Sequence, residues 1–234
     1  MKNHKKNHKN KRFIERFTKK CTERLYYKLR KFKESDADSL AKYANNPKIA
    51  KFLTHEFPSP YSKEDAKEFI YKIASEKPTK TFTISVNNES SGAIALTPTS
   101  IPDQSLKSAN LEQNNTVPDN FDEFDEFDEI AKVAKVAKVA EIGYWLAEDY
   151  WNKGIVTNCI KDMVCYGFET FNINRIFATP FVENKASQKV LKKAGFNLES
   201  ESKQIILKNS HYYEVLMFSI SREDFIRAFI QPDK

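Results

Sequence analysis

The half of the chain from Glu141 to Phe196 constrains the fold most, because it carries strand, turn and helix signals twice over. Glu141 to Ala147 is rich in aromatic and aliphatic residues, which is typical of a strand, and apolar residues at helical spacing follow it. Asn174 to Pro180 indicates a second strand, and Asn184 to Ala194 a second helix that Gly195 ends. This alternation predicts a mixed α/β fold.

The preceding residues add strands and helices of ordinary length. Three segments are expected to be strands and three helical, with a six-residue turn, Asn87 to Gly92, between the last two strands. The expected strands are Leu25 to Phe32, Thr81 to Val86 and Ala93 to Thr97. The expected helical segments are one that Ser35 or Asp36 caps, Ile49 to Leu53, and one that Ser62 and Asp65 open. Two strands around Lys203 to Leu207 and Tyr212 to Ile220 complete the expected sheet.

Residues 98–140 interrupt this pattern with a Pro, Ser and Asn-rich stretch and two triplet repeats, Phe-Asp-Glu and Ala-Lys-Val. We interpret them as a low-complexity insertion within one domain that spans residues 21–234. The acidic repeat either remains mobile or folds back on a basic segment. The Ala-Lys-Val repeat has good helix formers, so a short amphipathic helix is a further alternative.

Residues 1–20 form a basic arm with nine Lys or Arg and one acid, Glu15, so the arm has a net charge of +8. The whole chain has a net charge of +6, so the residues after the arm sum to −2. A segment so poor in apolar residues cannot bury enough surface to fold alone, so we expect it to be disordered. Ribosome, RNA or an anionic membrane is one class of partner, and mitochondrial targeting is another interpretation. A solubilising tail without a partner is the simplest alternative.

The composition favours an intracellular protein without metal. No apolar run is long enough for a membrane span or forms the core of a signal peptide. The three cysteines, Cys21, Cys159 and Cys165, lack the paired spacing of zinc or redox motifs. We therefore expect no disulfide and no metal site, and a cytoplasmic protein, with nuclear or mitochondrial targeting by the basic arm left open.

The loop Trp151 to Thr157 connects a strand to the start of a helix. Such a turn directs unpaired backbone N–H groups and the positive end of the helix dipole toward one place, where a diphosphate fits. Gly154 would let the backbone approach closely. On its own, a glycine at a strand-to-helix turn is more often plain turn chemistry.

The segment Val182 to Phe196, with Asn184, Ser187 and the pair Gly195-Phe196, closely resembles the cofactor-binding helix of GNAT acetyltransferases. Its position about 30 residues after the Gly154 loop also matches. The strand Glu141 to Leu146 and the pair Tyr150-Trp151 look like the RimJ/RimL branch, which acetylates the N-termini of ribosomal proteins. The resemblance covers about residues 24 to 97 and 140 to 220, and it implies a mostly antiparallel GNAT sheet flanked by helices, with an insertion before the fourth strand.

The resemblance also implies where acetyl-CoA binds. The fourth strand splays from its neighbour, so that Tyr144, Leu146 and Ala147 pair with the pantetheine arm as a missing strand would. The pyrophosphate lies on the loop that Asn152, Lys153, Gly154, Ile155, Val156 and Thr157 form. Asn184 and Ser187 approach the pantetheine and the thioester sulfur. From the sequence alone, Asn184 is equally well an ordinary helix cap.

Two positions depart from the family pattern. Val156 stands where the pyrophosphate loop usually has Gly or Ala, which loosens the expected fit. Leu191 stands where many relatives have a Tyr that protonates the departing thiolate. Ser187 or water would have to take that role.

The catalytic candidates are Glu141, as a base acting through water, and Ser187. An exposed acid at the end of a strand is the alternative interpretation of Glu141, and a backbone N–H near Leu146 is expected to meet the oxyanion. The resemblance implies direct acetyl transfer to a primary amine, above all a protein N-terminus. A small-molecule amine acetyltransferase and a catalytically weak fold that binds ribosome or nucleic acid through the basic arm are the alternatives.

Overall fold

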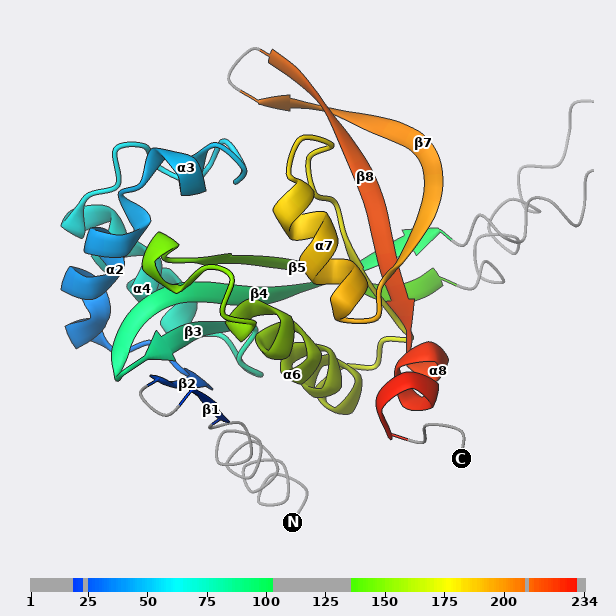
Figure 1. Ribbon diagram of the computed structural model, residues 1–234, viewed down its shortest axis with the longest axis horizontal. Helices are drawn as coiled ribbons and strands as arrows, with labels where there is room; N and C mark the ends of the chain where they lie inside the picture. The colour runs from blue at the N-terminus through cyan, green and yellow to red at the C-terminus, as the bar shows by residue number, and fades with distance from the viewer. Residues whose placement is uncertain (1–18, 23–24, 103–135, 209–210, 231–234) are drawn as a thin grey trace, which may run out of the picture.

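The computed structural model describes residues 19–22, 25–102, 136–208 and 211–230 (Figure 1). Residues 1–18 of the expected arm and 103–135 of the expected insertion lie outside the described residues. The strands are β1 (Lys19–Thr22), β2 (Leu25–Arg30), β3 (Thr81–Val86), β4 (Glu89–Pro102), β5 (Val136–Leu146), β6 (Arg175–Ala178), β7 (Asn197–Lys208) and β8 (His211–Ser221). The helices are η1 (Glu34–Asp36), α2 (Ala37–Ala44), α3 (Pro47–Ala50), α4 (Lys63–Ala74), η3 (Glu148–Tyr150), α6 (Ile155–Thr170), α7 (Lys185–Lys193), α8 (Arg222–Phe225) and η4 (Ile226–Ile230).

The described strands form one eight-stranded sheet of order β1-β2-β3-β4-β5-β6-β8-β7. Each pair of neighbours is antiparallel except β5 and β6, which are parallel. The mixed, mostly antiparallel sheet expected from the sequence is therefore confirmed. Its single parallel pair divides the sheet into an N-terminal and a C-terminal part.

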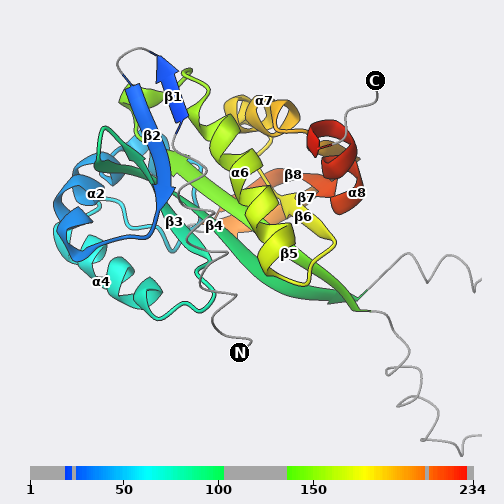
Figure 2. The ribbon, with the colours of Figure 1, turned by 90° about the horizontal axis from the view of Figure 1, so that it is seen from below.

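Helices cover the two faces of the sheet (Figures 1 and 2). The long helix α6 packs with α7 against one face, where a large apolar core includes Ile142, Leu146 and Met163. Helices α2 and α4 pack against the other face over a smaller core, against which Trp145 also lies. Because side chains alternate across a strand, β5 contributes to both cores.

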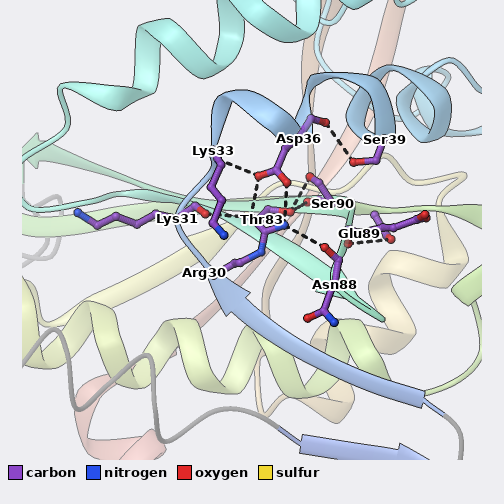
Figure 3. A network of polar contacts seen from close by, with 11 residues as sticks. Arg30, Lys31, Lys33, Asp36, Ser39, Thr83, Asn88, Glu89 and Ser90 are labelled. Atoms are coloured by element: carbon purple, nitrogen blue, oxygen red, sulfur yellow. Dashed lines mark hydrogen bonds and ion pairs between the residues drawn. The ribbon is translucent and has the colours of Figure 1, made fainter.

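The start of α2 differs from the simple cap that the sequence suggested. Asp36 precedes the helix, but its carboxylate accepts hydrogen bonds from both guanidinium nitrogens of Arg30, at 2.6 and 2.8 Å, and from the Lys33 amide at 2.8 Å (Figure 3). Burial alone would raise the pKa of Asp36, but these hydrogen bonds outweigh it and lower the pKa. Asp36 thus ties β2 to α2 and gives α2 no side-chain cap.

Other local signals are confirmed. Ser62 and Asp65 form a reciprocal capping box at the start of α4. Gly195 follows α7 at φ +92°, and the amides of Gly195 and Phe196 donate to the carbonyls of Lys192 and Leu191. This is the Schellman arrangement that a glycine permits after a helix.

Two strand boundaries correct the sequence-based expectation. Asn87 and Asn88 alone turn the chain, both with positive φ, so β4 begins at Glu89 and no six-residue turn exists. Residues 98–102 pair with residues 136–140, so both ends of the expected insertion belong to the sheet. Val136–Val139 are therefore strand, and a helix is wrong for this part of the Ala-Lys-Val repeat, because cross-strand pairing overrides helix propensity. Lys19 and Lys20, assigned to the arm, lie in β1.

Within the described ranges, no helix is long and apolar enough to cross a membrane.

Candidate active site

Strands β5 and β6 separate after a short paired stretch. Their register joins Val139 to Arg175, Ala140 to Ile176 and Glu141 to Phe177, and it ends there. The rest of β5, Ile142–Leu146, continues to pair with β4 on its other edge. We call this edge of Ile142–Leu146 the split. It confirms the splayed fourth strand that the sequence predicted.

Backbone groups of alternate residues face the split. The Ala147 amide donates to the Ser91 carbonyl at 2.8 Å, so Ala147 is bonded toward β4. Because bonding alternates along an antiparallel strand, Tyr144 and Leu146 turn their N–H and C=O groups toward the split. The Leu146 carbonyl accepts from the Trp151 indole nitrogen at 2.7 Å. The structure thus places Tyr144 and Leu146, but not the Ala147 amide, where the sequence-based prediction needs them.

The loop after β5 ends at the N-terminus of α6 with two left-handed residues, Asn152 at φ 60° and Gly154 at φ 73°. Gly154 is the N-cap, and no side chain caps the helix. The first helical bond runs from the Asn158 amide to the Gly154 carbonyl, so the amides of Ile155, Val156 and Thr157 precede the helical ladder. A Cβ at Gly154 would meet no atom within 4 Å. This end of the helix is open to an anion.

The side chains of this loop are arranged around those amides. Asn152, Lys153 and Gly154 are exposed, Val156 and Thr157 are half-buried, and Ile155 is buried. The Lys153 ammonium donates to the Asp149 carbonyl at 2.7 Å, which folds its side chain back over the loop. Val156 packs against the large core, so the departure from the family pattern lies on the buried side of the helix.

Asn184 caps α7. Its side-chain oxygen accepts from the Ser187 amide at 3.0 Å, so the helix-cap interpretation holds for this oxygen. The cap fixes Ser187 in the first turn of α7. From there the Ser187 hydroxyl lies 2.8 Å from the Tyr144 hydroxyl. Burial raises the pKa of Tyr144, against a smaller lowering by the Ser187 hydrogen bond, so the phenol is protonated at neutral pH.

Glu141 lies at the last paired position of β5 and β6, where the split begins. Its carboxylate accepts from the Thr179 hydroxyl at 2.8 Å and is half-buried. Tyr144 packs against the large core with Ile142 and Leu146, so Glu141 is on the opposite face of β5. The Glu141 carboxylate and the Tyr144–Ser187 hydroxyl pair therefore lie near the split on opposite faces of the sheet.

A family model described as the acetyltransferase (GNAT) domain matches residues 27–197 of this chain. The chain belongs to the GNAT family of acetyltransferases.

Similar proteins span different lengths of this GNAT chain. The putative ribosomal N-acetyltransferase YdaF of Bacillus subtilis is 29% identical over 85 residues, which is 36% of this chain and 46% of YdaF. This chain therefore spans about half the length of that relative. The uncharacterized N-acetyltransferase p20 of Bacillus licheniformis is 26% identical over 87% of this chain and 96% of its own length. The fold is similar to that of Mycobacterium smegmatis RimJ in complex with CoA-disulfide, with a TM-score of 0.61 at 17% identity over 85% of this chain and 83% of RimJ.

The residues of this GNAT chain fit coenzyme A by two independent features. The N-terminus of α6 has no side-chain cap, and the space in front of Gly154 is open. Exposed helix amides and a positive helix end suit a diphosphate. The Tyr144 and Leu146 backbone faces the split, where an amide-containing chain can pair as a strand does.

A contact between α3 and the β7–β8 hairpin was not revealed by the sequence. Lys208, at the end of β7, is buried, and its ammonium donates to the carbonyls of Ala50 and Lys51 at 2.8 and 3.0 Å. Burial lowers the pKa of Lys208. The Phe52 and Phe181 rings lie 6.2 Å apart beside it. Helix α3 is thereby fixed to the β7–β8 hairpin.

Two contacts had little sequence signal. The Tyr144 side chain reaches α7, and only the alternation of β5, which puts Tyr144 on the face of Ile142 and Leu146, could have suggested this contact. Lys208 and Ala50 are 158 residues apart, and no spacing rule links them.

Proposed function

We propose that this chain transfers the acetyl group of acetyl-CoA directly to a primary amine, most of all to the α-amino group of a protein N-terminus. The observation that supports it most is the split, with the open N-terminus of α6 at one end and Glu141 at the other. The name of the similar protein YdaF, a putative ribosomal N-acetyltransferase, supports a ribosomal protein as acceptor.

In this proposal, the backbone holds the cosubstrate. The amides of residues 152–157 receive the diphosphate, with Lys153 and Gly154 in the exposed part of the loop. Tyr144 and Leu146 pair with the pantetheine amides. The Leu146 N–H, which faces the split, meets the oxyanion. Asn184 holds the first turn of α7 so that Ser187 lies beside the sulfur. Ala147 contributes shape alone, because its amide is bonded to Ser91.

The acceptor approaches from the face of β5 that carries Glu141. An α-amino group has a pKa near ~8 and loses its proton far more readily than a Lys side chain near ~10.4, which favours an N-terminus. Glu141 accepts the proton of the attacking nitrogen through water, and the Thr179 hydrogen bond holds the carboxylate in place.

A pair of variants at Gly154 tests the cosubstrate site. Asn and Asp both tolerate positive φ and have the same size, so Gly154→Asn and Gly154→Asp differ in charge alone. Asp favours the helix dipole, so it stabilises α6 relative to Asn. The same charge repels a diphosphate, so we expect CoA affinity, measured by calorimetry, to be at least ~10-fold lower for Asp than for Asn. Equal affinities of the two variants would refute diphosphate binding at this loop.

Acceptor identity needs a separate assay. Thiol release from acetyl-CoA is measured with a library of N-terminal peptides and with a panel of small amines. We expect peptides to be preferred by kcat/KM, and an equal rate after deletion of residues 1–18. Preference for a small amine would favour the first alternative. Absent turnover, combined with salt-sensitive RNA binding that the deletion abolishes, would favour the binding module.

A further inference from the structure

The Tyr144–Ser187 hydroxyl pair joins strand β5 to helix α7 at the split. The two oxygen atoms are 2.8 Å apart, and either atom can donate. Tyr144 is half-buried against the large core, so its ring has a fixed direction. Ser187 is fixed in turn by the bond from its amide to Asn184. Both hydroxyls are therefore oriented before any ligand binds.

We infer that Tyr144 is a positioning residue: its hydroxyl holds Ser187, the residue that the GNAT resemblance assigns to the departing sulfur, in the orientation for donating to that sulfur. The inference rests on the proposed function, whose reaction it completes. It concerns the side chain of Tyr144, whereas the cosubstrate site uses the Tyr144 backbone.

Either hydroxyl of the pair can donate, and the phenol, as the more acidic group, favours donation from Tyr144 to Ser187. A phenol that keeps its proton can donate to the Ser187 oxygen. The hydroxyl hydrogen of Ser187 can then be donated to the thioester sulfur. The two hydroxyls form a chain of hydrogen bonds in which Tyr144 donates to Ser187 and Ser187 donates to the sulfur. Hydrogen bonds in such a chain strengthen one another, because each donor polarises the next.

Helix α7 has no tyrosine of its own, but the Tyr144 phenol of β5 contacts its first turn. Ser187 and Leu191 are one turn apart on the same face of α7. Leu191 is fully buried in the large core and has no hydroxyl to donate. A phenol from β5 instead reaches the same helix face one turn earlier, where it meets Ser187.

The reaction balances with this arrangement. The acceptor nitrogen attacks the thioester carbonyl carbon, a C–N bond forms and the C–S bond breaks. The nitrogen loses one proton to Glu141 through water, and the sulfur gains one proton through the Ser187 hydroxyl. The proton count is unchanged, so the step needs no additional reagent. Glu141 and Ser187 are on opposite faces of β5, which separates the group that takes a proton from the one that supplies it.

A double-mutant cycle tests the inference. Tyr144→Phe and Ser187→Ala each remove one hydroxyl and little else, and Tyr71→Phe is the matched control, because Tyr71 is 85% exposed on α4. We expect each single variant to lower kcat by about 10- to 100-fold, at the lower end of general acid catalysis. CoA affinity by calorimetry should change less than ~3-fold, because the hydroxyl pair acts on the sulfur in the transition state and the backbone groups that hold CoA are unchanged. The control should keep full activity.

The double variant Tyr144→Phe/Ser187→Ala decides whether the two act in series. If Tyr144 acts through Ser187, the double variant is no slower than Ser187→Ala alone. Losses that multiply would overturn the inference while leaving the proposed function intact, and so would a Tyr144→Phe variant with the kcat of the unmodified chain. No turnover of any peptide or amine by the unmodified chain would overturn the proposed function itself, and the inference with it.

Discussion

Gly143 leaves open space on the face of β5 that carries Glu141 and Trp145. A Cβ at this position would meet no atom within 4 Å. Side chains two residues apart on a strand share a face, so the space lies between a carboxylate and an indole. In the proposed function this is the face from which the acceptor amine reaches the split. Packing does not require a glycine here, and in the proposed function it makes room for the acceptor.

We predict that Gly143→Val excludes the acceptor without harming the fold. The branched side chain should raise the KM of a peptide acceptor at least ~10-fold, because it occupies the space that the amine needs. Stability should hold or rise, since β-branched residues favour strands. Steady-state kinetics and thermal unfolding measure both effects, with Gly143→Ala as the smaller step. An unchanged acceptor KM in the Val variant would place the acceptor elsewhere.

A second prediction separates the cap from the cosubstrate contact at Asn184. Asn184→Ala loses the bond to the Ser187 amide and should cost about 1 kcal/mol of stability. Asn184→Ser keeps a capping oxygen and should cost much less. If the Asn184 amide group also contacts pantetheine, both variants lose CoA affinity by calorimetry. Weakened affinity in the Ala variant alone would reduce Asn184 to a cap.

At the scale of residues, the sequence predicted the local contacts and missed the distant ones. The Ser62–Asp65 capping box, the Asn184 cap and the Gly195 stop each depend on residues within one turn of a helix, and spacing reveals them. The Tyr144–Ser187 pair and the Lys208 contacts join segments far apart in the chain. Their geometry depends on how the sheet and helices pack, which no local pattern encodes.

Among elements, the contact of α3 with the β7–β8 hairpin depends on one buried charge. Lys208 donates to the carbonyls of Ala50 and Lys51, at the C-terminal end of α3. The last carbonyls of a helix lack intrahelical partners, so an ammonium suits them. An exposed ion pair between Lys51 and Glu183, at 3.3 Å, lies on the same side. Surface pairs of this kind contribute little.

We therefore predict that Lys208→Met loosens α3. The methionine keeps much of the apolar length but leaves two carbonyls without their charged donor, which should cost about 1.5–3 kcal/mol. Acceptor KM should rise because the segment after α3 contacts Trp145, on the face of β5 that the proposed function gives to the acceptor, while CoA affinity should hold. The matched control, Lys51→Met, removes the surface pair alone and should cost under ~1 kcal/mol. Chemical unfolding and acceptor kinetics measure both variants. Equal losses of stability in the two variants would contradict the role of Lys208 in fixing α3 to the β7–β8 hairpin.

Element boundaries show where sequence patterns fail. The expected strands on either side of the insertion ended at Thr97 and began at Glu141, whereas β4 and β5 continue to pair as far as Pro102 and Val136. Prolines in β4 and helix formers in β5 hid this extension, because their local preferences oppose a strand. Whether such a stretch is a strand depends on its partner across the hairpin. Here the two partners are far apart in the sequence, because the residues between 102 and 136 separate them.

At the scale of the whole molecule, the buried tyrosines Tyr61 and Tyr166 couple stability to alkaline pH. The Tyr166 hydroxyl, on α6, donates to the Thr79 carbonyl just before β3 at 2.7 Å, and its ring contacts Phe82 and Phe171. Tyr61 packs on Phe57 in the smaller core. Burial raises the pKa of each to about 12, from the usual value of 10.0 for a tyrosine. Both cores thus contain a phenol that must stay neutral.

The sign of the pH effect follows from where each state holds its proton. Between about pH 10 and 12 the unfolded chain has lost the Tyr166 proton and the folded chain has kept it. The unfolded state therefore binds fewer protons, and stability falls as pH rises through this window. Burial lowers the pKa of Lys208 from its usual value of 10.5, so Lys208 acts in the opposite sense below that pH. Its effect is the same in every variant that retains Lys208 and therefore cancels in a comparison of such variants.

We predict that Tyr166→Phe makes the alkaline loss of stability shallower. At pH 8 the variant should be less stable by about 1 kcal/mol, because the Thr79 carbonyl loses its donor. Toward pH 11.5 that difference should shrink or reverse, since the phenylalanine has no proton to lose. Urea unfolding at constant ionic strength, from pH 8 to 11.5, measures the difference, and the exposed Tyr71→Phe should follow the unmodified chain throughout. A constant gap between Tyr166→Phe and the unmodified chain would mean that other groups control alkaline unfolding.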